Sequence, residues 1–180
     1  MYSIIDSKAQ RVHSKKNREL LCQLLRKCCF RNGAEIGVDS GIHAKMLLEM
    51  VSLDILYCVD SWARPDENKH NRFERTKARL RSFGERCVLI KMDSIEAAKT
   101  IRDGTLDFVY IDAGHLFDEV VTDVKVWLPK VKKGGILCGH DYVNVPGYCE
   151  VATAVTSLLP ESDIHTTPDS LWPEWWYYVK

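Results

Sequence analysis

From residue 33 onward the chain alternates short apolar runs with segments of helical periodicity, and this alternation restricts its fold more than any other feature. The apolar runs occupy 34–38, 54–60, 87–92, 106–112 and 136–141. Helical spacing of apolar residues covers 42–51, 66–83, 94–102 and 117–128. Strands that alternate with helices form βαβ units, so we predict an α/β fold in which a mostly parallel sheet carries helices on both faces.

The C-terminal part departs from this pattern. It predicts a helix over 147–159, a short extended stretch near Ile164 and a last strand within 172–180. The connection between the last two leaves no room for a crossover helix, so they should form an antiparallel hairpin. The run of bulky residues in the last strand predicts burial on both of its faces.

The N-terminal part predicts an amphipathic helix over 14–31 that caps the sheet. Its apolar stripe consists of Leu20, Leu21, Leu24, Leu25 and Cys28. We therefore divide the chain into a helical extension, residues 1–31, and one domain, residues 32–180.

The composition is that of an ordinary globular domain of 180 residues. No apolar run approaches the ~20 residues that a membrane-spanning helix requires, and the first residues lack the apolar stretch of a secretory signal. The seven cysteines are an odd number without C-x-x-C spacing, so we expect reduced thiols rather than disulfides or a zinc site. These features predict a cytoplasmic protein without a membrane partner.

The 25 basic and 25 acidic residues cancel, but they are unevenly distributed. Residues 1–31 carry 8 basic and 2 acidic side chains and 64–91 carry 9 and 4, whereas the rest of the chain carries 8 and 19. This polarity either attracts an anionic ligand to one surface or forms two solvated helix faces. Neither basic stretch contains a nucleic-acid-binding module, so we expect no nucleic-acid partner.

In a parallel sheet, ligands bind at the carboxyl ends of the strands. The first strand is followed by an E-x-G-x-x-x-G turn that contains Glu35, Gly37, Asp39, Ser40 and Gly41. Glycines allow a ligand to approach the backbone closely, and the next helix offers its N-terminal N–H groups. A glycine-containing turn of this kind also occurs where no ligand binds.

Acidic residues end the next two strands. Asp60-Ser61-Trp62 follows the second, and its carboxylate can accept hydrogen bonds from a ribose diol. Asp93-Ser94 follows the third, where Asp93 can reach an adenine amine or simply cap the next helix. Together with the glycine turn, these residues predict a nucleoside site.

Two further acids, Asp112 and Asp141, end the fourth and fifth strands. If these strands are neighbours, their ends lie ~4.8 Å apart and both carboxylates can hold one divalent cation. His115 and His140 flank the pair as candidates for a general base and a metal ligand. The alternative is that Asp112 and Asp141 only support the turns that follow them.

From Gly33 to Lys180 the chain resembles class I S-adenosylmethionine-dependent methyltransferases. It looks most similar to small macrocin-type sugar O-methyltransferases and, more distantly, to catechol O-methyltransferase. The matching segments are AEIGVDSG, ILYCVDSW, KMDSIEAA, DFVYIDAGH and LPKVKKGGILCGHDY, in this order. The sequence departs from the family pattern at Asp39, which replaces a glycine, at Gly114, which replaces a second acid, and at His140, which precedes a single acid.

The resemblance implies a Rossmann-like, seven-stranded sheet of order 3-2-1-4-5-7-6 with strand 7 antiparallel. It implies S-adenosylmethionine as cofactor and Mg²⁺ or Mn²⁺ as metal. The implied cofactor-binding residues are those of the nucleoside site and Asp112. The implied metal ligands are Asp112, His140 and Asp141, and the implied catalytic residues are Asp112 and His115, with His115 as base.

The implied reaction is methyl transfer to a hydroxyl of a small-molecule or glycan acceptor. The basic stretch 64–91 would suit a nucleotide-linked sugar, and the C-terminal aromatic residues either stack on a sugar or are simply buried. A catechol-type phenol acceptor stays open, as do a nicotinamide-dependent oxidoreductase and a non-catalytic binding module. The sequence also leaves open whether the domain acts alone, as a homodimer or beside a glycosyltransferase domain.

Overall fold

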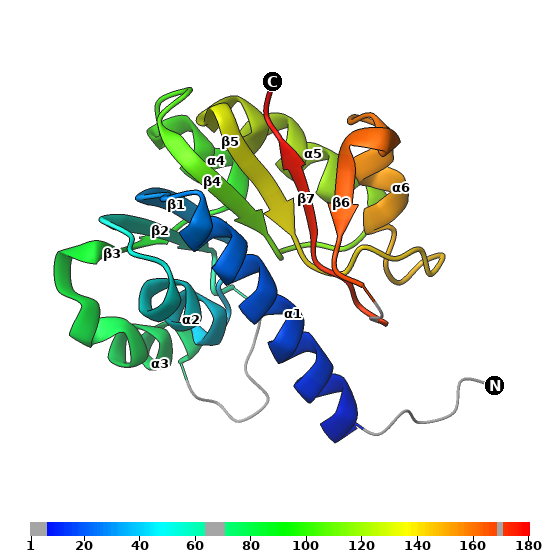
Figure 1. Cartoon of the computed structure of the whole chain (residues 1–180). Coiled ribbons are helices and arrows are strands. Elements are labelled where there is room, and N and C mark those ends of the chain that lie inside the picture. The colour runs from blue at the N-terminus through cyan, green and yellow to red at the C-terminus, as the bar shows by residue number, and fades with distance from the viewer. Residues whose placement is uncertain (1–6, 64–70, 169–170) are drawn as a thin grey trace.

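The computed structural model describes residues 7–63, 71–168 and 171–180, with side chains from residue 15 onward. Seven strands form one sheet in the order β3-β2-β1-β4-β5-β7-β6 (Figure 1). β7 alone runs antiparallel, against both β5 and β6. The strands are β1 (Asn32–Ile36), β2 (Ile55–Asp60), β3 (Cys87–Lys91), β4 (Leu106–Ile111), β5 (Val131–Gly139), β6 (Ile164–Thr166) and β7 (Trp175–Tyr178). The predicted α/β fold and strand order are therefore confirmed.

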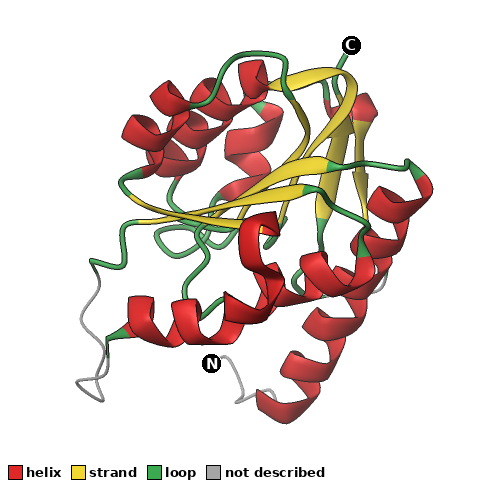
Figure 2. Ribbon diagram, turned by 90° about the vertical axis from the view of Figure 1, so that its left-hand side faces the viewer, coloured by secondary structure: helices red, strands yellow, loops and turns green. Residues whose placement is uncertain are grey.

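Helices cover both faces of this sheet, as Figure 2 shows. On one face lie α1 (Ser7–Lys27), α2 (Ile42–Met50) and α3 (Arg72–Leu80), and on the other lie α4 (Ser94–Thr100), α5 (Phe117–Trp127) and α6 (Val151–Thr156). Three short 3-10 helices are η1 (Arg81–Arg86), η2 (Leu128–Lys130) and η3 (Glu161–Asp163). Each face has its own apolar core, and every residue of the central strand β4 is buried between them.

Three helices differ in extent from the predictions. The predicted helix 66–83 is observed as α3, followed directly by η1, which contains a kink at Gly84 (φ 57°). Residues 64–70 lie outside the described residues. The predicted helix 147–159 is shortened to α6, because Val145 and Cys149 form a β-bridge before it. The N-terminal helix is longer than predicted and begins at Ser7.

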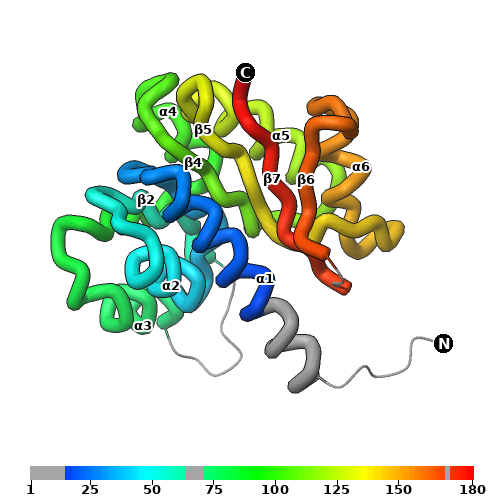
Figure 3. Tube along the Cα trace, in the orientation of Figure 1, coloured from blue at the N-terminus to red at the C-terminus, as the bar shows by residue number. Residues whose placement is uncertain are grey.

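The apolar side of α1 is rotated relative to the predicted stripe. Leu21, Cys22 and Leu25 are buried against the sheet and α2, whereas Leu20 is 39% exposed. The helix crosses the front of the molecule towards the lower edge, where the loops after β5 and before β7 also lie (Figure 3). The extension is therefore packed into the same core as the domain.

β7 is buried on one face rather than on both. Trp175 and Tyr177 are buried, but Tyr178 is 41% exposed at the edge of the molecule. The seven cysteines are all free thiols, as expected. None of the helices that the structure describes combines the length and the hydropathy that a membrane span requires.

Candidate active site

The carboxyl ends of β1 to β4 open into one cavity of about 790 Å³. Eight of the eleven predicted cofactor-binding residues line it: Gly37, Asp39, Asp60, Ser61, Trp62, Asp93, Ser94 and Asp112. The other three, Glu35, Ser40 and Gly41, are not among its lining residues. The cavity therefore lies where parallel-sheet topology places a ligand.

The turn after β1 is held in a backbone conformation that suits glycine. Gly37 has φ +89°, and a Cβ there would lie 2.1 Å from the carbonyl oxygen of Asp112. Asp39, which stands where the family has a glycine, also has a positive φ of 46°. An aspartate tolerates this region better than most residues, so the departure at position 39 keeps the shape of the turn.

Glu35 points away from the cavity. Its side chain is 2% exposed, and Oε1 lies 3.4 Å from Nδ1 of His43 on α2. Burial raises the pKa of Glu35 well above its usual value, so this carboxyl favours the neutral form. The structure therefore places Glu35 beneath the turn, in a supporting position.

Asp60 connects the loop after β2 to the loop after β1. Its carboxylate accepts hydrogen bonds from the backbone N–H groups of Asp39 (2.8 Å) and Trp62 (2.7 Å). The indole of Trp62 donates to the carbonyl oxygen of Asp39 (2.7 Å), and Arg72 donates to the Asp39 carboxylate (2.9 Å). Each oxygen of Asp60 keeps lone-pair capacity for a ribose hydroxyl.

The loop after β3 contains the residue that caps α4, and it contacts a buried acid on α5 that the sequence did not predict. Asp93 caps α4 by accepting a hydrogen bond from the backbone of Ile95 (2.9 Å), and it also lines the cavity. Ser94 donates to Asp123 on α5, which is 6% exposed. Burial raises the pKa of Asp123 to about 6. Three further residues of α5 that line the cavity were not predicted: Asp118, Glu119 and Thr122. The signal that could have indicated them is the recurrence of polar residues along one face of the helix after β4.

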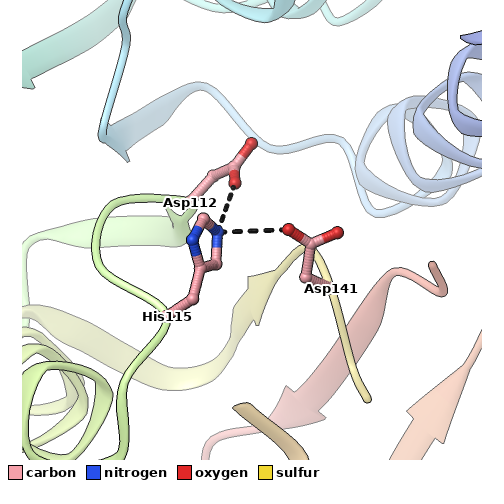
Figure 4. A group of neighbouring side chains, drawn as sticks. All are labelled: Asp112, His115 and Asp141. Carbon is pink, nitrogen blue, oxygen red and sulfur yellow. Dashed lines mark ion pairs between the residues drawn. The ribbon is translucent and has the colours of Figure 1, made fainter. Parts of the chain in front are cut away.

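At the other side of the cavity, Asp112, His115 and Asp141 point toward one another from the ends of β4 and β5 (Figure 4). Nε2 of His115 lies 3.1 Å from Oδ2 of Asp141 and 3.5 Å from Oδ1 of Asp112. Asp141 has a positive φ of 57°, a region that aspartate tolerates and that recurs at functional sites. The two aspartates thus converge as the strand order predicts.

The electrostatics of this cluster favour a positively charged His115 beside an ionised Asp141. Contacts with Asp112 and then Asp141 raise the pKa of His115 to about 10. Burial alone would raise the pKa of Asp141, but the neighbouring His115 and His140 hold it below its usual value. His115 is therefore an imidazolium at neutral pH when no cation is bound.

His140, a predicted metal ligand, lies outside the group of three. It lies behind Asp141, with Nδ1 against the Asp141 carboxylate and Nε2 3.4 Å from Oε1 of the buried Glu174. The group that could share one ion contains His115 in its place. The reason is that the loop after β4 is held against the start of α6, where the N–H of Glu150 donates to the carbonyl oxygen of His115 (2.8 Å).

The donor set of this cluster fits a divalent cation. One atom from each residue lies within 4.8 Å of the others, and ligands ~2.1 Å from one ion are about 3 Å apart in octahedral geometry. Two carboxylates with one imidazole suit Mn²⁺ or another borderline ion better than Mg²⁺, which prefers oxygen ligands. The predicted carboxylate pair is thus compatible with a metal site, with His115 as its third member.

Comparisons with known proteins agree with this geometry. Residues 34–142, more than half of the chain, match the family model described as "Methyltransferase domain". "Uncharacterized protein y4gI" of Sinorhizobium fredii is 26% identical over 89 residues, which is 47% of this chain and 10% of that relative. The chain therefore spans about a tenth of the length of this curated relative.

Two solved structures share the whole fold. A caffeoyl-CoA O-methyltransferase-like protein of Staphylococcus aureus has a TM-score of 0.69 at 13% identity, covering 97% of this chain and 92% of its own. N-methyltransferase NodS of Bradyrhizobium japonicum, bound to S-adenosylhomocysteine, has a TM-score of 0.66 at 14% identity, covering 92% and 87%. The sheet order, the cavity and the family match lead to one conclusion: this chain belongs to the methyltransferase-domain family, with the Rossmann-like fold of class I enzymes.

Proposed function

We propose that this chain is an S-adenosylmethionine-dependent O-methyltransferase that acts on a hydroxyl of a sugar or glycan with the help of a divalent cation. The observation that carries the proposal is the position of Asp112. This residue lines the cofactor cavity and also belongs to the cluster with His115 and Asp141. A methyl donor in the cavity would therefore lie directly beside the groups that can activate an acceptor.

On the cofactor side, the residues bind and orient the donor. Asp60 would accept hydrogen bonds from the ribose, and the loop at Asp93 and Ser94 would face the adenine. The turn at Gly37 lets the backbone approach the methionine part closely. The sulfonium methyl group is already activated, so alignment with the attacking oxygen is the main contribution here.

On the acceptor side, the residues provide the charge that deprotonation of a hydroxyl requires. Asp112, His115 and Asp141 would hold the cation, in place of the predicted set with His140. A bound divalent cation lowers the pKa of a coordinated hydroxyl. A His115 that holds the cation through Nε2 cannot also take a proton at that atom, so this arrangement gives His115 the role of ligand in place of its predicted role as base. Without a cation, its two carboxylate neighbours keep it protonated.

One exposed and one half-buried aromatic residue, on loops connected to the cluster, support a ring-shaped acceptor. Tyr148, which is 68% exposed, lies edge-on to Trp172 with ring centroids 6.3 Å apart. Their loops are joined to the site, because the N–H of Tyr142 donates to the carbonyl oxygen of Pro173 (3.0 Å). Such a pair suits a sugar ring. A phenol is the second candidate, favoured by the likeness to the caffeoyl-CoA O-methyltransferase-like protein.

The test is methyl transfer from labelled S-adenosylmethionine to a panel of nucleotide-linked sugars, simple glycosides and catechol. We expect a labelled sugar product in the presence of Mn²⁺ and its loss with EDTA or in Asp141→Ala. Asp103→Ala is the control, because Asp103 is an exposed acid that pairs with Lys130. Transfer to catechol alone would establish the phenol alternative. Transfer that is insensitive to EDTA would refute the proposed requirement for a divalent cation.

Calorimetry distinguishes the remaining alternatives. Binding of S-adenosylmethionine without transfer to any acceptor would indicate a non-catalytic binding module. Binding of NAD in its place would contradict the proposed cofactor. The proposal requires neither a nucleic acid nor a membrane.

A further inference from the structure

Arg18 brings a positive charge from the N-terminal helix into the reaction centre. Its Nη2 donates a hydrogen bond of 2.7 Å to Oδ2 of Asp112, and its Nε lies 3.8 Å from Oε1 of Glu174. The Arg18 side chain is only 21% exposed. Both Arg18 and Glu174 lie outside residues 34–142, the part that matches the methyltransferase-domain family. α1 reaches this position by crossing the sheet towards its carboxyl edge (Figure 1).

The contact selects which oxygen of Asp112 faces the cluster. Oδ2 is occupied by Arg18, whereas Oδ1 faces Nε2 of His115 at 3.5 Å. A carboxylate without such a partner can turn about its terminal torsion, which is broad. The guanidinium therefore fixes the rotation of Asp112 and leaves Oδ1 for the point where His115 and Asp141 converge.

Glu174 anchors the other side of the guanidinium. It is fully buried, accepts a hydrogen bond from the hydroxyl of Tyr110 (2.9 Å) through Oε2, and has no hydrogen bond at Oε1. Burying an acid without a counter-charge is costly, so an arginine beside it stabilises the arrangement. Arg18 thus lies between a buried anchor and the acid that lines the cofactor cavity.

We propose that Arg18 is a positioning residue of the reaction centre, which orients Asp112 and limits how strongly the cluster attracts a divalent cation. The proposal rests on the proposed function, since it assumes that Asp112, His115 and Asp141 form the cation site. An arginine stays charged at every relevant pH, so it always opposes a cation on the same carboxylate. If Arg18 only fastened α1 to the domain, its removal would loosen the site and weaken ligand binding.

The two roles predict opposite changes in cation affinity. We would titrate Mn²⁺ alone into the full chain by calorimetry and compare wild type with Arg18→Gln. We expect Arg18→Gln to bind Mn²⁺ at least ~10-fold more tightly, because Asp112 and Glu174 lose the permanent charge of Arg18 and keep only their histidine neighbours. Lys15→Gln is the matched control: it removes the same charge from the same helix, but Lys15 is exposed and its ion pair among the described side chains is with Glu19. It should stay within about twofold of wild type.

Equal or weaker binding by Arg18→Gln than by Lys15→Gln would overturn the proposal. If wild type binds Mn²⁺ too weakly to measure, Arg18→Gln alone should show binding, and its failure to do so would also refute Arg18 as the limiting charge. Absence of S-adenosylmethionine binding in wild type would instead refute the proposed function, while the Mn²⁺ comparison would still decide the role of Arg18.

Arg18→Lys keeps the comparison decisive if Arg18→Gln does not fold. Lysine preserves the charge but, as a point charge, cannot reproduce the planar fork of the guanidinium. We expect Mn²⁺ and S-adenosylmethionine affinities within about threefold of wild type and transfer to the acceptor reduced about tenfold. A parallel loss of both affinities would show that Arg18 serves only the packing of α1.

Discussion

The cofactor side and the acceptor side of the site are built from different kinds of interaction. On the cofactor side, the carboxylate of Asp60 is held by backbone N–H groups of Asp39 and Trp62, which lie 21 and 2 residues away. On the acceptor side, side chains hold one another, and Arg18 reaches Asp112 across 94 residues. Backbone donors of two adjoining loops therefore shape the loops after β1 and β2, and side-chain pairs between distant elements bring charges together on the acceptor side.

This difference has a consequence for how each half responds to change. Backbone donors persist when a neighbouring side chain is replaced, so the cofactor side should tolerate most substitutions around it. In the charged cluster, each member is the partner of another, and removing one leaves a partly buried charge with less compensation. The two halves meet at Gly37, whose α-carbon faces the carbonyl oxygen of Asp112.

The largest effect is expected where the halves meet. In Gly37→Ala, the added Cβ would lie 2.1 Å from the carbonyl oxygen of Asp112, and φ is +89°. Overpacking and the strained backbone together should lower the free energy of unfolding by about 4 kcal/mol. Urea denaturation measures this change.

Gly104→Ala is the control for the backbone contribution. Gly104 has φ +64° but no atom within 4 Å of an added Cβ, so only about 1 kcal/mol should be lost. Equal losses in the two variants would show that the contact between the turn after β1 and Asp112 does not hold the halves together.

The same difference explains how much of the site the sequence could predict. Asp60, Asp93 and Asp112 each follow an apolar run, and parallel pairing aligns the ends of such runs. Their positions therefore follow from a one-dimensional pattern. The α/β class was predictable for the same reason, since the alternation of strands and helices indicates a parallel sheet, whereas the strand order came from the resemblance to class I methyltransferases.

The residues that were missed depend on packing between distant elements. Arg18 is one of several basic residues on an amphipathic helix, where a charged side chain usually faces solvent. Glu174 lies in the loop before β7, and Asp123 lies on α5, whose rotation against α4 decides what it faces. His115 rather than His140 joins the cluster because of a loop contact that no periodicity records.

The second prediction tests whether the cofactor side binds its ligand independently of the acceptor side. Asp60→Ala should weaken S-adenosylmethionine binding about 100-fold, or about 3 kcal/mol, since charge-assisted bonds to the ribose and to two backbone groups are lost. Mn²⁺ binding should be unchanged, and calorimetry measures both. Asp54→Ala, at the opposite end of the same strand and paired with Arg31, should leave both unchanged. A loss of Mn²⁺ binding in Asp60→Ala would mean that the two halves are coupled.

A third prediction concerns the buried acid on the cofactor side. Burial raises the pKa of Asp123 from 3.8 to about 6, so between these values the folded state binds the proton more tightly than the unfolded state. The free energy of unfolding should therefore fall as pH rises from about 4 to 6 and stay level above that range, a loss of about 3 kcal/mol.

Asp123→Asn should abolish this fall. An amide oxygen can still accept the hydrogen bond from Ser94, so the variant should match wild type near pH 4 and exceed its stability at pH 7. Thermal or urea unfolding of the cofactor-free protein at several pH values provides the measurement. Parallel pH profiles for the two proteins would contradict a buried, proton-binding Asp123.

The smallest effect is expected at the rim of the acceptor side, at Tyr148, because this side chain is exposed and its removal leaves no charged group unpaired. Tyr148→Ala removes a ring that lies against Trp172, so it should raise KM for the acceptor about fivefold, near 1 kcal/mol, and leave kcat and S-adenosylmethionine affinity unchanged. Tyr148→Phe keeps the ring and should behave as wild type. A fall in kcat in Tyr148→Ala would instead mean that this loop holds Asp141 in place. The geometry of the charged cluster would then depend on packing at the rim as well.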